Sequence, residues 1–206
     1  MPARSRRENE CMHGLINRSF QRFITAMHGP GAWQAVADEA GLGPGGFSPL
    51  DQYEDALTER LVVALARHRA LPLADILEDF GVYLVAHPEN AALRRLLRFG
   101  GHDFTAFLLS LGQLDARARL ALPELDVPRC SLRPARAGHY EVAVSWHNRN
   151  AVNVVAGVLR AMADDYGALA LIEAAPARGR RQGAIRVSVL DEGHATGRAF
   201  ALAVAR

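Results

Sequence analysis

Residues 104–122 read FTAFLLSLGQLDARARLAL, and this stretch decides how the rest of the chain is interpreted. Apolar side chains recur in it at steps of three and four, which predicts one amphipathic helix with a single apolar stripe. The stripe consists of Phe104, Phe107, Leu108, Leu111, Leu114, Ala118 and Leu122. Asp115 lies on or beside this stripe. A carboxylate there has to find a partner, reach solvent or take up a proton, because burying it unpaired is costly.

Before this stretch the sequence predicts only helices and loops. Helical spacing of apolar residues, with breaks at Gly29-Pro30-Gly31 and Gly100-Gly101, separates them. A segment rich in Gly and Pro, residues 42–49, is expected to be a loop. The predicted helices cover residues 12–28, 32–40, 51–68, 72–86 and 91–99.

After Pro123 the pattern changes to short alternating segments. Strands are predicted at 130–136, 139–146, 168–174 and 184–190, and one helix at 150–166 with Gly167 as its C-cap. The chain is therefore expected to be an α+β protein, a helical part followed by a four-stranded antiparallel sheet with one helix. The order of the strands does not follow from the pattern.

The bulk composition favours one soluble domain. The chain has 206 residues, 50% of them hydrophobic, and a net charge of +2 that is too small to argue for nucleic acid. Two cysteines fit a reducing compartment, and no segment reads as a secretory signal or a membrane span. We expect a cytoplasmic protein that does not bind membranes. The expected organisation is a disordered tail at 1–11, a domain at 12–190 (helical part 12–122, sheet part 123–190) and a C-terminal tail at 191–206.

No arrangement of residues predicts catalysis. The sequence holds no nucleophile–base pair, no paired zinc ligands and no phosphate-binding loop. We therefore expect a protein that is not an enzyme.

Several segments, in order, resemble the haem-nitric oxide/oxygen binding (H-NOX) sensor domain family. They are Met12-His13-Gly14, HGPGAWQAVADEAGL (28–42), ADILEDFG (74–81), LRFGGHDFTAFLLSLGQLD (97–115) and Val127-Pro128-Arg129. The likeness extends over residues 12 to 190. It implies a haem b between the helical part and the sheet, a diatomic gas as ligand, and a histidine kinase or a cyclic-dinucleotide signalling protein as partner.

The resemblance also assigns positions to a haem site. Asp115 occupies the position of the family's iron-ligating histidine, and Pro128 matches the proline that presses on the porphyrin. The Tyr-x-Ser-x-Arg clamp for the haem propionates corresponds to Ser145, His147 and Arg149, of which only the arginine is kept. Arginine suits a carboxylate as a bidentate donor, and serine and histidine still donate hydrogen bonds.

These departures leave two interpretations open. A carboxylate is a harder, anionic ligand than imidazole and favours ferric iron, so the first is a non-enzymatic sensor domain with atypical or absent haem ligation. The second is a haem-free regulatory or scaffold domain that acts through protein–protein contacts. Asp115 is accordingly either a functional acid or a solvated residue at a helix edge. His147 and Arg149 either bind a carboxylate or phosphate, or are ordinary residues between a strand and a helix.

Other candidate residues have simpler interpretations. His102 precedes Asp115 by thirteen residues, about 20 Å along a helix, so it cannot replace the iron ligand and is expected at the surface or in a cap. His13 is a candidate distal contact, and Cys130 is expected to be a packed thiol. Two arginine sets are either a partner-binding face or solvated strand edges and turns: Arg129, Arg133 and Arg136, and Arg178, Arg180 and Arg181.

Overall fold

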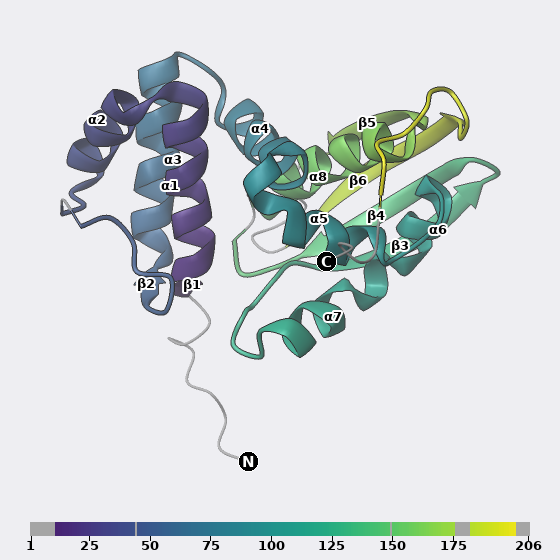
Figure 1. The fold of residues 1–206 in the computed structure, drawn as a ribbon, viewed down its shortest axis with the longest axis horizontal. Coiled ribbons are helices and arrows are strands. Elements are labelled where there is room, and N and C mark those ends of the chain that lie inside the picture. The colour runs from purple at the N-terminus through teal and green to yellow at the C-terminus, as the bar shows by residue number, and fades with distance from the viewer. Residues whose placement is uncertain (1–10, 44, 149, 176–181, 201–206) are drawn as a thin grey trace. The chain divides into compact units, whose positions relative to one another are not determined.

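The computed structural model describes residues 11–43, 45–148, 150–175 and 182–200. The chain divides into two compact units, Met1–Phe80 and Gly81–Arg206, joined within one helix, α4 (Figure 1). No helix among the described residues is long and apolar enough to cross a membrane. The predicted disordered tail falls mostly on residues 1–10 and the end of the C-terminal tail on 201–206, and both ranges lie outside the described residues.

The first unit is helical, as predicted. It consists of α1 (Gly14–His28), α2 (Pro30–Ala40), α3 (Asp55–Arg69) and the start of α4 (Leu73–Ala86). Its core includes Phe20, Phe23 and Phe80, with the rings of Phe20 and Phe80 edge to face at 5.1 Å. Edge-to-face aromatic pairs contribute beyond their buried area, so these rings help hold α1 against α4 within the unit.

Three predicted helix boundaries in this unit are wrong. The first helix starts at Gly14 rather than residue 12, because residues 11–13 form a short strand. The second helix starts at Pro30 rather than residue 32, because Gly29 makes the turn alone with φ 87° and proline suits a first helical position. The third helix starts at Asp55 rather than residue 51, because β2 (Gln52–Glu54) pairs antiparallel with β1 (Cys11–His13). Strands of three residues leave too little alternation to be seen in a sequence.

The second unit is built on a four-stranded antiparallel sheet, as predicted. Its strands are β3 (Arg129–Arg136), β4 (His139–Ser145), β5 (Leu169–Ala175) and β6 (Gln182–Asp191), in the order β3-β4-β6-β5. Val142 lies opposite Leu132 on one side and Ile185 on the other, and the two residues Val142 and Ile185 are fully buried. One face of the sheet is therefore the core face.

Helix α8 (Ala151–Tyr166) covers this core face, packing against β4, β5 and β6. Two glycines allow close approach to it. A Cβ on Gly183 of β6 would lie 2.7 Å from the Val152 Cβ, and one on Gly81 of α4 would lie 2.1 Å from the Val154 carbonyl oxygen. The predicted C-cap is confirmed, since Gly167 ends α8 in the left-handed conformation with φ 80°.

The stretch 104–122 is helical but not one α-helix. It forms α6 (Phe104–Ser110), a 3-10 turn η3 (Leu111–Gln113) and α7 (Leu114–Ala121), preceded by η2 (Pro88–Asn90) and α5 (Ala91–Arg98). Backbone angles stay right-handed through the turn, so the apolar stripe continues and Phe104, Phe107, Leu108 and Leu111 are all buried. Gly112 inside the 3-10 turn is a weak helix former, which fits a break at this point.

Candidate functional site

Asp115 lies in the first turn of α7 and is held by two arginines. Its Oδ1 is 2.9 Å from Arg119 Nε, one turn further along the helix, and its Oδ2 is 3.6 Å from Arg129 Nε at the start of β3. The Asp115 side chain is 22% exposed. The contact with Arg119 is an ion pair whose angles fall short of a hydrogen bond. A carboxylate at a helix N-terminus also meets the positive end of the helix dipole, so this position suits a negative charge without a metal ion.

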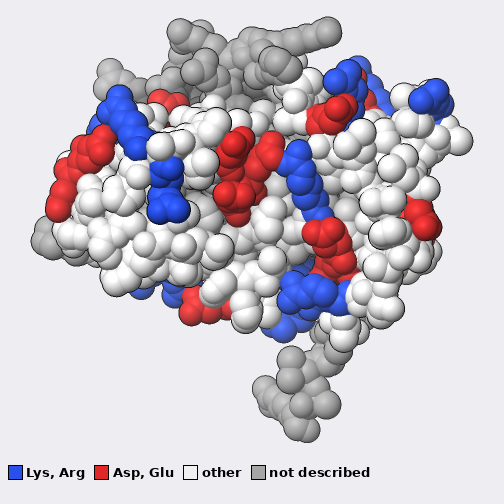
Figure 2. Space-filling model, turned by 90° about the horizontal axis from the view of Figure 1, so that it is seen from above, with Lys and Arg blue, Asp and Glu red and all other residues white. Residues whose placement is uncertain are grey.

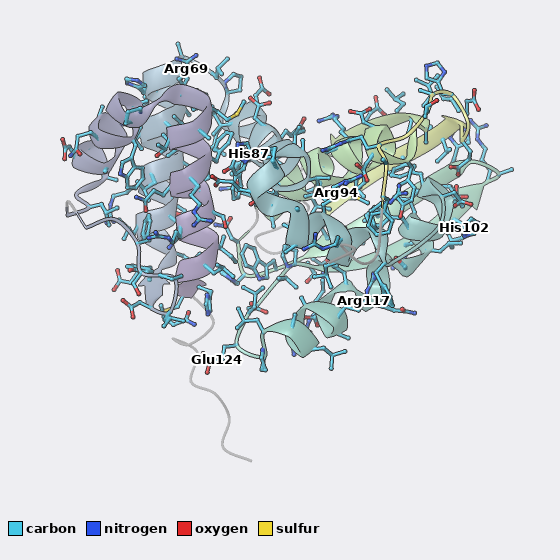
Figure 3. The ribbon with its side chains drawn as sticks, in the orientation of Figure 1. Arg69, His87, Arg94, His102, Arg117 and Glu124 are labelled. Carbon is cyan, nitrogen blue, oxygen red and sulfur yellow. The ribbon has the colours of Figure 1, made fainter. Side chains whose placement is uncertain are left out.

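The ion pairs continue from Asp115 into the loop that follows α7. Arg119 Nη2 lies 3.9 Å from Asp126 Oδ1, and Asp126 Oδ2 accepts a hydrogen bond from Trp146 Nε1 at 3.0 Å. His147 Nε2 lies 3.7 Å from the same Oδ2. We call these six residues the Asp115 network: Asp115, Arg119, Asp126, Arg129, Trp146 and His147. The network ties together α7, the loop before β3 and the loop after β4. In Figure 3, α7 can be found by the label of Arg117 and the loop before β3 by the label of Glu124.

Two of the three residues predicted for a propionate clamp, Ser145 and His147, lie at the end of β4. Ser145 is the last residue of the strand, exposed, and opposite Arg129 on β3. The His147 side chain is only 7% exposed, and its ring centroid is 4.1 Å from that of Trp146. Pro128 is partly buried directly before β3. Arg149 lies outside the described residues.

The other candidate residues are placed as follows. His102 has an 88% exposed side chain and pairs with Asp103, the N-cap of α6. His13 is buried in the first unit and caps α1, where its Nδ1 accepts a hydrogen bond from the Leu15 amide at 3.1 Å. Cys130 is buried at the start of β3, and burial raises the pKa of its thiol to about 12. A thiol held neutral in this way is a poor metal ligand.

Asp126 and Trp146 were not predicted to belong to a site. The spacing of Asp115 and Arg119, four residues apart on one helix, was a readable signal for their ion pair. Nothing in the sequence marks Asp126, because its role depends on how the loop before β3 approaches the end of β4. The arginine sets predicted as a possible partner face are only partly described, since Arg178, Arg180 and Arg181 fall outside the described residues. On the face that Figure 2 shows, acidic and basic side chains are interspersed rather than gathered by sign.

The Haem-NO-binding family model matches residues 13–173. The chain belongs to the haem-NO-binding family. A curated relative, the soluble guanylate cyclase gcy-35 of Caenorhabditis elegans, is 30% identical over 104 residues, which are 50% of this chain and 15% of that protein. The chain thus spans a small part of the length of this relative.

Solved H-NOX structures share the fold. A mutant H-NOX protein from S. oneidensis in the Fe(II) ligation state superposes with a TM-score of 0.75 at 16% identity, covering 88% of this chain and 97% of that one. A mutant H-NOX of T. Tengcongensis gives a TM-score of 0.71 at 12% identity, covering 88% and 99%. Identities this low establish the fold alone, which is the H-NOX α+β fold that the sequence predicted.

The residues predicted for the haem site do not fit a histidine-ligated iron. Both carboxylate oxygens of Asp115 face guanidinium groups, and the thiol of Cys130 is held neutral. Among the described residues no group of three or more His, Cys, Asp or Glu side chains is arranged to hold a metal ion.

Proposed function

We propose that this chain is a non-enzymatic signalling domain of the haem-NO-binding family that acts without a haem iron bound at residue 115. The observation that carries the proposal is the pairing of Asp115 with Arg119 and Arg129. To bind iron, the carboxylate would have to give up two charge-assisted contacts. It would then favour ferric iron, which does not suit a ferrous gas sensor.

In this proposal the Asp115 network takes the structural place of an iron–ligand bond. In a histidine-ligated member of the family, the iron–histidine bond would tie this helix to the cofactor. Here the network ties α7 to the loop before β3 and to the loop after β4. A change at either loop is then transmitted to α7 by breaking or making ion pairs. Because several of these groups are partly exposed, each pair is weak, and the network can rearrange at modest cost.

The output of such a domain is read by another protein. The resemblance to the family suggests a histidine kinase or a cyclic-dinucleotide signalling protein in the cytoplasm, and the name of gcy-35 adds a guanylate cyclase as a third kind of reader. The match to gcy-35 extends over 15% of that protein, which suits a regulatory part rather than a whole enzyme.

A second candidate function is a sensor that binds haem through a ligand other than Asp115. Family membership favours it, as do the hydrogen-bonding side chains Ser145 and His147 at the clamp positions. In this alternative the two side chains would donate to haem carboxylates, and a diatomic gas would be the ligand.

Titration with haemin separates the two functions. The purified protein, its fold checked by circular dichroism, is titrated with haemin while the Soret band is recorded. The proposal expects no saturable Soret band at one equivalent. The Asp115→His variant, titrated in parallel, tests residue 115 directly: a histidine-type Soret band in this variant alone would mark the carboxylate as the feature that excludes the iron. Stoichiometric uptake by the unaltered protein would favour the second candidate.

A further inference from the structure

The segment after β6, residues 192–200, lies across the end of α8, and we call it the C-terminal strap. It has no regular secondary structure, yet backbone hydrogen bonds fix it at two points. The Ala195 amide donates to the Gly167 carbonyl at 3.0 Å, and the Arg198 amide donates to the Asp165 carbonyl at 3.0 Å. Figure 1 shows the same end of the chain returning over the second unit.

Beneath the strap, Asp165 of α8 is a fully buried carboxylate surrounded by arginines. Its Oδ1 is 2.7 Å from Arg94 Nε, and its Oδ2 is 3.7 Å from Arg98 Nη1, both on α5. Arg198 of the strap adds a third guanidinium, with Nε 3.7 Å from Oδ1. Two of the three arginines around Asp165 therefore come from α5 and not from the strap; Arg94 is labelled in Figure 3.

This surface contacts two side chains of the strap that lie two residues apart, Arg198 and Phe200. Arg198 pairs with Asp165 and donates through Nη1 to the Ala86 carbonyl at 3.4 Å. Between the two side chains, Arg94 Nη2 donates to the backbone carbonyl of Ala199 at 3.0 Å. The Arg98 guanidinium lies 4.9 Å from the Phe200 ring centroid, within cation–π range.

Close backbone approach adds a steric requirement. A Cβ on Gly197 would lie 2.7 Å from the Asp165 carbonyl oxygen, so only glycine allows the strap to lie flat on the end of α8. By contrast, a Cβ on Gly193, at the start of the strap, would meet nothing closer than a side-chain oxygen at 4.0 Å. The two glycines form a matched pair for mutation.

The strap is held mostly by polar contacts. Its side chains are largely exposed, and Arg198 itself is 49% exposed. A segment with few buried apolar contacts and solvent-accessible hydrogen bonds opens at a lower free energy than the core. The site beneath is built around a buried carboxylate that pairs with two arginines of α5.

We infer that this surface is a peptide-docking site, that the strap occupies it in cis, and that a partner segment carrying Arg-x-aromatic displaces the strap. The site would report to α7, the helix that carries Asp115, because α5 packs against α7 and Gly100, two residues after the end of α5, lies close to Arg117. A Cβ on Gly100 would lie 2.3 Å from Ser110 Oγ and 3.0 Å from Arg117 Nη1 on α7. This link to signalling rests on the proposed function, whereas the docking itself does not.

A labelled peptide of residues 192–200 tests the docking. Fluorescence anisotropy is measured with three full-length proteins: the parent, Gly197→Val, whose strap no longer fits, and Gly193→Val as the control. Hydrogen exchange at the amides of Ala195 and Arg198 verifies opening. We expect faster exchange and at least tenfold tighter peptide binding in Gly197→Val than in the other two proteins. The peptide with Arg198→Ala should lose at least tenfold in affinity.

Four results would overturn the inference. The peptide would not bind Gly197→Val, or it would bind all three proteins equally. The Arg198→Ala peptide would bind as tightly as the original peptide, or hydrogen exchange at Ala195 and Arg198 would be unchanged in Gly197→Val. A parent protein that is dimeric by light scattering through exchanged straps would also overturn it, since the occupant would then be a second copy. If Gly197→Val does not fold, Arg198→Ala in the full chain provides the opened state. Haem absorbance is not used, so a failed docking test leaves the proposed function standing.

Discussion

Asp115 and Arg119 form an ion pair one helical turn apart at the start of α7, with Oδ1 and Nε separated by 2.9 Å. Arg129 approaches the second carboxylate oxygen from β3. Both oxygens of this carboxylate are therefore engaged by the protein itself. Through Arg129 this pairing connects α7 to the sheet.

Replacing Asp115 by Asn should destabilise the protein by about 0.5–1 kcal/mol, because the pairs are partly solvent-exposed and the charge also favours a helix N-terminus. The loss should shrink in high salt, which screens such pairs. Urea unfolding at low and high salt measures both effects. A loss that does not depend on salt would contradict the ion-pair account.

Replacing Asp165 by Asn should cost much more, about 3 kcal/mol or more, because it leaves the largely buried Arg94 and Arg98 without their fully buried counter-charge. The adjacent Asp164 is exposed, so Asp164→Asn is the matched control and should change stability by no more than about 0.5 kcal/mol. Thermal and urea unfolding of the two variants provide the comparison. Equal effects would show that Asp165 is not an anchor.

Cys130 should be nearly inert to alkylating reagents in the folded protein, because burial raises the pKa of its thiol to about 12 from 9.0. Cys11 is only partly buried and should react first; mass spectrometry of the labelled peptides distinguishes the two. The raised pKa also means that the folded state holds the proton more tightly than the unfolded state. This contribution to stability is present below pH 9 and is lost as the pH rises toward 12. The Cys130→Val variant should lose less stability than the parent above pH 9.

His28 should make the protein less stable in mild acid. Burial lowers the pKa of His28 below 6.5, and the nearby positive charge of Arg69 adds to the effect while Asp79 opposes it. The unfolded chain then binds a proton that the folded chain does not, so stability falls as the pH drops through 6.5. Urea midpoints at pH 7.5 and 5.5 should differ more in the parent than in His28→Gln. Equal differences would assign the acid sensitivity to other groups.

Much of the fold was readable from the sequence because its signals are local. The spacing of Val154, Val158 and Met162 with Gly167 behind them gave α8 to within one residue, and the breaks at Gly29 and Gly100 separated the helices. The strand order β3-β4-β6-β5 depends on contacts between distant segments, so no local pattern encodes it. The same holds for β1 and β2, whose pairing joins residues about forty positions apart.

The candidate site was readable in part for the same reason. Asp115 stood out because it interrupts an apolar stripe, and Arg119 follows at ion-pair spacing. Asp126 joins the network only because the loop before β3 brings it to Trp146, twenty residues further on. Asp165 was hidden within α8, since its arginine partners come from α5 and from a strap without a periodic pattern.

The central claim is that residue 115 does not hold a haem iron, and one absorption measurement tests it most directly. The protein is purified from haem-supplemented cells, and the Soret absorbance is divided by the protein concentration to give haem per chain. The account predicts a folded protein with far less than one haem per chain. A Soret band at one haem per chain that is lost in Asp115→Ala would contradict it, because the carboxylate would then be the iron ligand.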